Sequence, residues 1–189
     1  NTLFNVGLLS YGSPEQQQRY LPRVASDTVA AYALSEAGSG SDAFALACRA
    51  ERRGEEWVLD GHKLWITSGD EAGLYLVFAN ADPPQGYRGI TAFIVERGDP
   101  GFSVGKRESK LGLRASSTCE LLFEDCEVPA ENVLGVEGGG VKVLMSGLDY
   151  ERAVLSGGPL GIMAACMDVV LPYVHDRKQF GQSIGEFQL

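Results

Sequence analysis

Apolar and polar residues alternate in a pattern that divides the chain into a helical start, a middle of strands and a helical end. In the middle, short apolar runs such as residues 74–78, 90–95 and 118–123 are separated by tight turns. In the last run, Cys119, Leu121 and Phe123 occupy every second position, which is typical of a strand with one buried face. We therefore expect an α+β chain in which a β-barrel or orthogonal sandwich is flanked by helical segments.

A short helix is predicted near the amino terminus. Ser13 is a suitable N-cap, Pro14 fits the first helical position, and Gln16 can complete a capping box. Pro22 is expected to interrupt or end this helix, because proline lacks the N–H group that a helix interior requires. The helix would close a first segment, residues 1–27.

Glycine and proline mark the remaining boundaries. Asp60 and Gly61 lie between two apolar runs and predict a β-hairpin with a two-residue turn. After the glycines at 138–140, apolar residues recur at helical spacing. Gly157-Gly158-Pro159 is expected either to kink this helical region or to divide it in two. We thus expect three segments, residues 1–27, 28–135 and 136–189.

Composition and charge exclude several classes of function. The 189 residues carry a net charge of −9, with 16 basic and 25 acidic residues. The longest basic run is Arg52-Arg53, which argues against a nucleic-acid partner. We expect no membrane span, because no apolar run approaches the roughly 20 residues that a bilayer needs. The first residue is Asn1 rather than Met, so we expect a piece of a longer protein.

The cysteines are expected to be reduced core residues. Cys48, Cys119, Cys126 and Cys166 are scattered, and none belongs to a C-x-x-C pair. The two histidines are far apart in sequence, so no metal site is predicted. Four separate thiols are typical of a reducing compartment.

The first candidate site combines a Gly/Ser-rich segment with an aromatic strand end. Residues 32–42 read YALSEAGSGSD, and such small residues allow their backbone N–H groups to approach a phosphate or a planar ring. Trp65 and Thr67 offer a flat aromatic ring and a hydroxyl group. Taken separately, a polar loop, a core tryptophan and a solvent-facing threonine are the commoner interpretations.

The second candidate site lies on the carboxy-terminal helix. Asp149 and Arg152 are three residues apart, so they share a helix face and could hold a polar ligand together. Glu151 stands among apolar residues and is a candidate general base. A solvated ion pair is the commoner interpretation of such residues. Arg177, followed closely by Phe180, could bind a phosphate or simply complement the helix dipole.

All these segments occur together in one known family. The chain resembles the acyl-CoA dehydrogenases over its whole length, on the runs above and on GITAF (89–93), KLGLRAS (110–116) and FEDCEVP (123–129). Residues 1–117 are most similar to short/branched-chain acyl-CoA dehydrogenases, and residues 144–189 to isovaleryl-CoA dehydrogenases. The resemblance implies the family's fold, in which a β-barrel domain stands between helical domains.

The resemblance also implies FAD as the cofactor and acyl-CoA as the substrate. The positions that would contact FAD are Tyr32, Leu34, Ser35, Gly40, Ser41, Trp65, Ile66, Thr67, Arg177, Phe180 and Gln188. Those that would hold the acyl-CoA are Ser41, Tyr87, Asp149 and Arg152. Arg177 and Gln188 would reach the FAD of a neighbouring subunit in a homotetramer.

Glu151 distinguishes the subfamilies. Isovaleryl-CoA dehydrogenases place their catalytic carboxylate at this position, whereas most family members place it further along, beyond residue 189. The resemblance therefore implies an α,β-dehydrogenation of a short branched acyl-CoA, in which Glu151 removes the α-proton and electrons pass on to electron-transfer flavoprotein. The implied compartment is a bacterial cytoplasm or a mitochondrial matrix.

Three alternatives stay open at this point. One is a dehydrogenase of 2-methyl-branched or straight short-chain acyl-CoA, with its base beyond residue 189. Another is a related acyl-CoA oxidase or flavin monooxygenase of the same fold. The third is a non-catalytic segment that serves in assembly.

Overall fold

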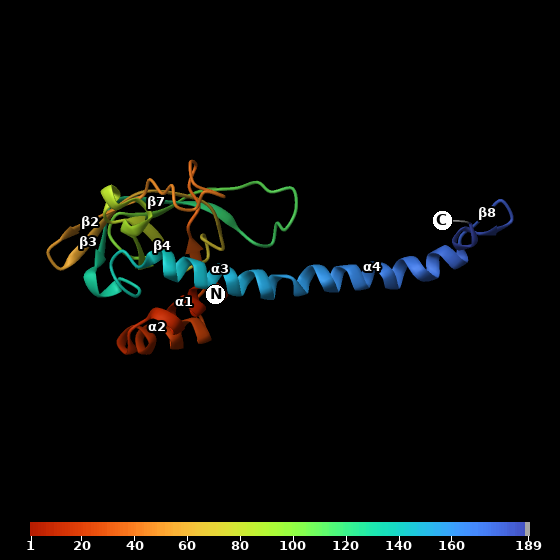
Figure 1. Cartoon of the computed structure of the whole chain (residues 1–189), viewed down its shortest axis with the longest axis horizontal. Coiled ribbons are helices and arrows are strands. Elements are labelled where there is room, and N and C mark those ends of the chain that lie inside the picture. The colour runs from red at the N-terminus through yellow and green to blue at the C-terminus, as the bar shows by residue number, and fades with distance from the viewer. Residues whose placement is uncertain (188–189) are drawn as a thin grey trace. The chain divides into compact units, whose positions relative to one another are not determined.

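Residues 1–187 are described here by a computed structural model, in which one mixed sheet of seven strands occupies the centre of residues 1–148 (Figure 1). The strands are β1 (Ala30–Ala33), β2 (Arg49–Arg53), β3 (Glu56–Thr67), β4 (Leu74–Asn80), β5 (Ile90–Glu96), β6 (Phe102–Arg107) and β7 (Thr118–Pro129). Their order is β1-β4-β2-β3-β7-β6, and β5 pairs with β4 outside this path. The predicted α+β class is confirmed, with the β-domain built as a half-barrel.

Strand β4 separates two hydrophobic cores. Its sequence LYLVFAN is buried at every position, and alternate residues face opposite sides. Tyr75 and Val77 pack into the first core, together with side chains from β2, β3 and β7. Leu76 and Phe78 pack into the second core, which is completed by the helices. This double burial explains why the run is continuously apolar rather than alternating.

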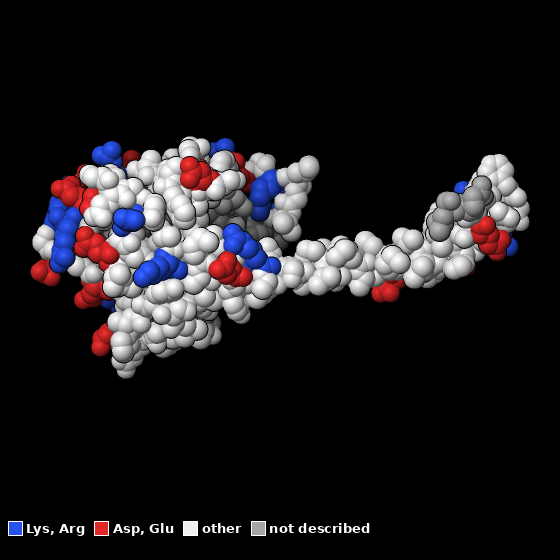
Figure 2. All heavy atoms as spheres, in the orientation of Figure 1, with Lys and Arg blue, Asp and Glu red and all other residues white. Residues whose placement is uncertain are grey.

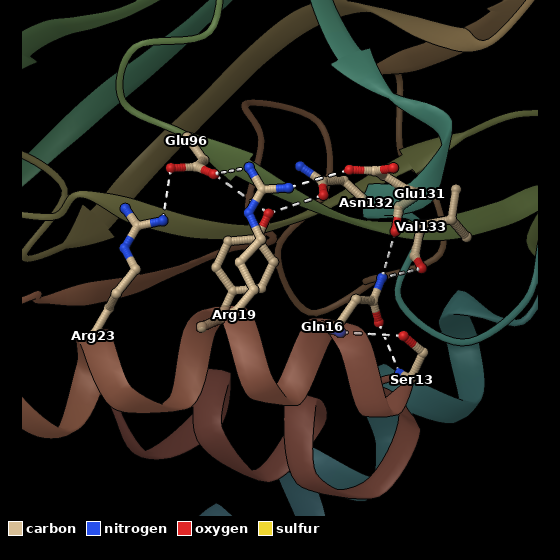
Figure 3. A network of polar contacts seen from close by, with 9 residues as sticks. Ser13, Gln16, Arg19, Arg23, Glu96, Glu131, Asn132 and Val133 are labelled. Carbon is tan, nitrogen blue, oxygen red and sulfur yellow. Dashed lines mark hydrogen bonds and ion pairs between the residues drawn. The ribbon is translucent and has the colours of Figure 1, made fainter.

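The helices α1 (Thr2–Tyr11) and α2 (Pro14–Ser26) lie together below the sheet in Figure 1. The predicted capping box of α2 is confirmed: the Gln16 N–H donates to Ser13 Oγ at 3.2 Å, and the Ser13 N–H donates to Gln16 Oε1 at 3.0 Å. Figure 3 shows that Gln16 also faces the segment after β7, where its Nε2 donates to the carbonyls of Glu131 and Val133. The N-cap therefore also ties the helix to the β-domain.

A second set of polar contacts holds α2 on β5. Arg19 and Arg23 each place a guanidinium nitrogen 2.8 Å from a carboxylate oxygen of Glu96, at the end of β5 (Figure 3). Between them, the Tyr20 hydroxyl lies 2.9 Å from Asn132 Oδ1 in a fully buried position. The network fixes how the amino-terminal helices cover the second core.

Two predicted boundaries are wrong. Helix α2 continues through Pro22 to Ser26, because Pro22 is exposed and water can hydrate the carbonyl that loses its helical donor. Asp60 and Gly61 do not form a hairpin turn but lie inside the continuous strand β3. An added Cβ at Gly61 would stand 2.7 Å from atoms of Cys48, so the glycine permits a close approach of two backbones.

Asp60 has a separate role at the same place. The pairing of β3 with β7 shifts register between Leu59 and Gly61, where Asp125 of β7 has a φ of 47°. The Asp125 N–H donates to Asp60 Oδ1 at 2.8 Å, which satisfies a donor that the bulge removes from the ladder. The sequence D-G therefore marks a bulge between two long strands.

Other differences concern element lengths. The helix α1 and the strands β2 and β6 were not predicted, and β7 extends six residues beyond the predicted end at Phe123, to Pro129. Short 3₁₀ helices follow β4 and β7, namely η1 (Pro83–Gly89) and η2 (Ala130–Asn132). The buried alternation of Cys119, Leu121 and Phe123 is confirmed.

Helix α3 (Gly140–Leu155) begins in the first compact unit, Asn1–Leu148, and ends in the second, Asp149–Leu189. The second unit continues with α4 (Gly157–Asp176), the two-residue strands β8 (Lys178–Gln179) and β9 (Gln182–Ser183), and η3 (Ile184–Glu186). The helical region is divided at Ser156, directly before Gly157-Gly158-Pro159, which begin α4; division is one of the two outcomes predicted.

Helix α4 is strongly apolar and exposed. Figure 2 shows few charged side chains along it, and no residue of α4 is buried. Over Gly140–Asp176 an 18-residue window reaches a mean hydropathy of 1.7, so by length and composition this region could cross a membrane. The prediction that no apolar run approaches that length is therefore wrong. Cys166 of α4 is exposed, in contrast to its predicted burial, whereas the other three cysteines are buried.

The two cores should weaken at alkaline pH. Burial raises the pKa of Tyr20 and of Tyr75 to about 12, that of Cys126 to about 12 and that of Cys48 to about 11. The unfolded chain ionises first, so it binds fewer protons than the folded chain and stability falls as pH rises. Each group lowers stability by up to about 1.4 kcal/mol per pH unit between its unfolded and its folded pKa, which is from about 9 for the cysteines and from about 10 for the tyrosines. Urea unfolding across this range measures the slope, and Tyr20→Phe should make it shallower above pH 10. An unchanged slope in that variant would contradict the assignment.

Candidate flavin and thioester site

Trp65 stands at a bulge in β3 with its indole exposed. The pairing with β7 shifts register between Lys63 and Ile66, so β3 carries an extra residue there. Trp65 has a φ of 58°, and 56% of its surface is exposed. A bulky residue in this left-handed region stores roughly 1–3 kcal/mol of strain, and such strain is concentrated at ligand sites. The fold thus holds a large aromatic ring toward solvent.

The Gly/Ser-rich segment, residues 35–42, closes on itself and on β3. Glu36 and Ser39 exchange two backbone hydrogen bonds, and Ser39 Oγ donates to the Asp42 carbonyl at 2.8 Å. The Leu64 N–H donates to the Ser35 carbonyl at 2.8 Å. The structure therefore brings together the two segments that the sequence singled out for the first candidate site.

The surface between these segments is open. An added Cβ at Gly38 or Gly40 would meet nothing within 4 Å, and Gly40, Ser41 and Thr67 are exposed. Ile66 is the exception, because its side chain is 2% exposed in the first core. Ile66 can therefore contact a ligand only through its backbone. The two hydrogen-bonded segments thus expose small residues, an indole and a hydroxyl group, which are the groups that suit a planar, hydrogen-bonding ring.

Lys63 and Glu36 form a buried ion pair beneath this surface. Lys63 Nζ lies 2.6 Å from Glu36 Oε1, and the two side chains are 0% and 6% exposed. Glu36 also accepts the backbone N–H groups of Ala47, at 2.7 Å, and of Cys48, at 3.2 Å. Lys63 Nζ donates a second hydrogen bond to the Leu34 carbonyl at 3.1 Å.

Tyr32 and Leu34 lie where β1 leads into the Gly/Ser-rich segment. The Tyr32 ring is half-buried and stacks against Phe78, with centroids 5.1 Å apart. Leu34 is half-buried, and both residues pack against the second core. Their backbones are thereby fixed at the entrance to residues 35–42.

Tyr87 belongs to an exposed aromatic cluster on η1. Its ring lies 5.9 Å from that of Phe44, which follows Ser41 by three residues. The Arg88 guanidinium lies 5.7 Å from the Tyr87 ring centroid. The structure thus links the segment around Ser41 to Tyr87 and adds a cation beside them.

In the second unit, the end of α3 carries three charged residues. Arg152 Nη1 lies 3.0 Å from Asp149 Oδ1 in an exposed ion pair, as the spacing predicts. Glu151 is partly exposed, and its carboxylate makes no hydrogen bond or ion pair with another side chain among the described residues. The carboxylate is therefore available to a ligand that approaches this face.

Arg177 and Phe180 lie at the end of α4. Arg177 is the C-cap of the helix, and its N–H donates to the Tyr173 carbonyl at 2.9 Å. Phe180 and Gly181 both have positive φ and form the turn between β8 and β9. Phe180 is 94% exposed in this strained position, so, like Trp65, it presents an aromatic ring outward. Gln188 lies outside the described residues.

Four residues of this region were missed in the sequence: Glu36, Phe44, Lys63 and Arg88. For Lys63 a signal existed, because it follows Trp57 and Leu59 at even spacing and therefore falls on the inward face of β3. A lysine at an inward position requires a buried partner. Phe44 and Arg88 left no comparable pattern, since each is a single residue in a loop.

Comparison with known proteins decides the family. The model of the acyl-CoA dehydrogenase middle domain matches residues 31–126, which is more than half of the chain, and that of the acyl-CoA dehydrogenase C-terminal domain matches residues 138–189. The chain belongs to the acyl-CoA dehydrogenase family. Between the two matches, residues 127–137 contain the end of β7 and η2, and the second match begins two residues before α3.

Individual acyl-CoA dehydrogenases are also similar. The mitochondrial 2-methylacyl-CoA dehydrogenase of Solanum tuberosum is 55% identical over 96% of this chain, and the mitochondrial isovaleryl-CoA dehydrogenase of Oryza sativa subsp. japonica is 53% identical over 96%. The chain spans 44% of the length of each. Among solved structures, an acyl-CoA dehydrogenase from Bacillus anthracis complexed with FAD has a TM-score of 0.86 at 37% identity, over 97% of this chain and 31% of that one.

Proposed function

We propose that the intact protein is an FAD-dependent dehydrogenase of short branched acyl-CoA thioesters, and that it converts isovaleryl-CoA or a close analogue to the enoyl-CoA. The observation that carries the proposal is a strained, exposed Trp65 on a strand that is hydrogen-bonded, through Leu64 and Ser35, to a segment with exposed residues at Gly38, Gly40 and Ser41. A bound flavin would account for the exposure and for the strain of Trp65 together.

The described residues fit FAD. Trp65 offers its indole face to the isoalloxazine, Thr67 offers a hydroxyl group, and the backbone N–H groups around Gly40 and Ser41 suit the pyrophosphate. The second unit offers Arg177 and Phe180 for the FAD of a neighbouring subunit. When bound, FAD supplies the acceptor for the β-hydride of the thioester.

The residues of α3 would act on the substrate. The Glu151 carboxylate accepts the α-proton, while Asp149 and Arg152 hold the acyl-CoA in place and Ser41 and Tyr87 contact its outer part. Arg88 and Phe44, which cluster with Tyr87, extend this surface with a cation and a second ring. Holding the thioester in one orientation supplies a large part of the rate enhancement.

The similar proteins help to choose which acyl chain the substrate carries. Glu151 favours an isovaleryl-type enzyme, and one similar relative is an isovaleryl-CoA dehydrogenase. The 2-methylacyl-CoA dehydrogenase of Solanum tuberosum supports 2-methyl-branched substrates as the second candidate.

Partners and location complete the proposal. Electrons leave through electron-transfer flavoprotein, and the protein is a homotetramer in a bacterial cytoplasm or a mitochondrial matrix. The mitochondrial relatives support the second location. Helix α4 does not cross a membrane in this proposal. It belongs to the matched C-terminal domain and carries Asp168 near its middle, so its apolar surface packs against further helices of that domain.

An anaerobic titration of the intact protein tests the function. Isovaleryl-CoA, 2-methylbutyryl-CoA and butyryl-CoA are added separately while the visible absorbance of the flavin is followed. Bleaching that is strongest with isovaleryl-CoA supports the proposal, and strongest bleaching with 2-methylbutyryl-CoA selects the second candidate. Failure of the protein to retain flavin, or no bleaching with any thioester, refutes it. Rapid reoxidation of the reduced flavin by oxygen would identify an oxidase instead.

The strain at Trp65 gives a separate prediction. In Trp65→Gly the left-handed backbone is no longer strained, and this gain offsets the loss of the ring's partial packing. We expect the stability of the apo-protein to change by less than about 1 kcal/mol, while FAD affinity falls at least about tenfold. Thermal unfolding of the apo-protein and fluorescence titration with FAD measure the two quantities. Equal FAD affinity in the variant would remove Trp65 from the flavin site.

A further inference from the structure

The buried pair of Lys63 and Glu36 connects the two halves of the candidate flavin surface. Lys63 belongs to β3, two residues before Trp65, and Glu36 lies inside the Gly/Ser-rich segment, residues 35–42. The Nζ···Oε1 distance is 2.6 Å. Lys63 also donates to the backbone beside Glu36, and Glu36 accepts two backbone N–H groups at residues 47 and 48, so the contact is a clamp of several bonds.

The contacts of the clamp surround the start of the segment. Lys63 Nζ binds the Leu34 carbonyl, and the adjacent Leu64 N–H binds the Ser35 carbonyl. The Glu36 carboxylate accepts the N–H groups of Ala47 and Cys48, where the chain enters β2. Residues 34–36 are therefore tied to β3 on one side and to the segment before β2 on the other.

A clamp of this kind is a poor source of stability. Taking two charges out of water has a desolvation cost, and this cost offsets much of the attraction between them. Well-packed neutral side chains often replace buried ion pairs without loss of stability. A buried ion pair instead restricts geometry. Because Lys63 is 0% exposed, its ammonium group can be hydrogen-bonded only when the Glu36 carboxylate and the Leu34 carbonyl are in this position. The pair thus selects one position of the segment.

We propose that Lys63 and Glu36 are positioning residues, which lock the loop of residues 35–42 against the bulge at Trp65 and so hold the flavin surface in its binding geometry. The inference rests on the proposed function, since it assigns the loop to FAD. Neither side chain touches the ligand in this proposal. Each acts through the backbone that it holds.

The test uses four double variants of the intact protein. Lys63→Met/Glu36→Gln removes both charges and keeps the side-chain volumes. Lys63→Gln/Glu36→Gln also removes both charges but retains an amide donor for the Leu34 carbonyl. Lys106→Met/Glu108→Gln is the matched control, because Lys106 and Glu108 form an ion pair at 3.2 Å at the end of the edge strand β6, with side chains that are 67% and 27% exposed. Lys106→Gln/Glu108→Gln controls for the second chemistry.

The readouts are the dissociation constant of FAD and the hydrogen exchange of amides in residues 34–42. We expect Lys63→Met/Glu36→Gln to fold, to bind FAD at least tenfold more weakly and to exchange faster in this loop. Lys63→Gln/Glu36→Gln should recover part of the affinity, and both control pairs should match the wild type. Rescue by an amide pair is not expected from loss of packing alone.

The outcomes separate this inference from the proposed function. An FAD dissociation constant within twofold of the wild type in Lys63→Met/Glu36→Gln overturns the inference while the function stands. If the wild type itself does not bind FAD, the function fails, and unchanged exchange in residues 34–42 of the variant then overturns the clamp as well. If Lys63→Met/Glu36→Gln does not fold, the comparison passes to Lys63→Gln/Glu36→Gln. Weaker FAD binding than in the wild type together with faster exchange in residues 34–42 then supports the inference, and wild-type affinity or unchanged exchange overturns it.

Discussion

Replacing Glu151 with glutamine is expected to leave FAD bound and to lower the rate of flavin bleaching by isovaleryl-CoA roughly 10²–10⁴-fold. The amide keeps the size and the hydrogen-bonding reach of the carboxylate but cannot accept the α-proton. Glu151 is partly exposed on α3, one residue before Arg152, so the substitution should not disturb the fold. Rapid mixing under anaerobic conditions measures the rate.

Glu55→Gln is the matched control for this experiment. Glu55 is an exposed carboxylate in the turn between β2 and β3 and takes no part in the candidate site. Its variant should bleach at the wild-type rate. Bleaching that survives in Glu151→Gln would place the base beyond residue 189 and favour the 2-methyl-branched or straight-chain alternatives.

Lys63→Met alone is expected to destabilise the β-domain by about 3–5 kcal/mol, because it leaves the Glu36 carboxylate buried without its cation. The effect is large compared with the typical stability of a domain, about 5–15 kcal/mol. Hydrogen exchange of the β3 and β7 amides at increasing urea concentration measures the free energy of opening.

Two comparisons show whether buried charge is the cause. Lys106→Met removes an exposed lysine whose side chain is 67% accessible, so it should change stability by no more than about 1 kcal/mol. Adding Glu36→Gln to Lys63→Met should restore much of the lost stability. A double variant as unstable as the single variant would show that packing around Lys63, rather than the unpaired charge, stabilises this part of the fold.

The sequence predicted those parts of the fold that depend on neighbours along the chain. The capping box at Ser13 and Gln16 is such a feature, and so is the alternation in β7. The errors arose where distant segments meet. Asp60-Gly61 has the composition of a hairpin turn, but β3 continues because Cys48 packs against Gly61 and β7 pairs along its length.

The candidate site shows the same division. The segments around Ser41 and Trp65 were found from their residue types, and the spacing of Asp149 and Arg152 gave their ion pair. The left-handed backbone of Trp65 could not be inferred, because it depends on a register shift between β3 and β7. The partner of Lys63 also depends on tertiary structure, since Glu36 lies 27 residues away in sequence.

The double burial of β4 bears on how this protein can be handled as fragments. One face of the strand is covered by α1 and α3 through Phe4, Leu8, Val143 and Leu144, all of which lie outside residues 31–126 of the matched middle domain. A fragment limited to residues 31–126 would expose Leu74, Leu76 and Phe78 to solvent. These residues belong to a strand without charged residues or proline, and that composition is typical of aggregation-prone strands. We therefore expect residues 31–126 alone to aggregate, and residues 1–148, which keep both covering helices, to be the better fragment to express.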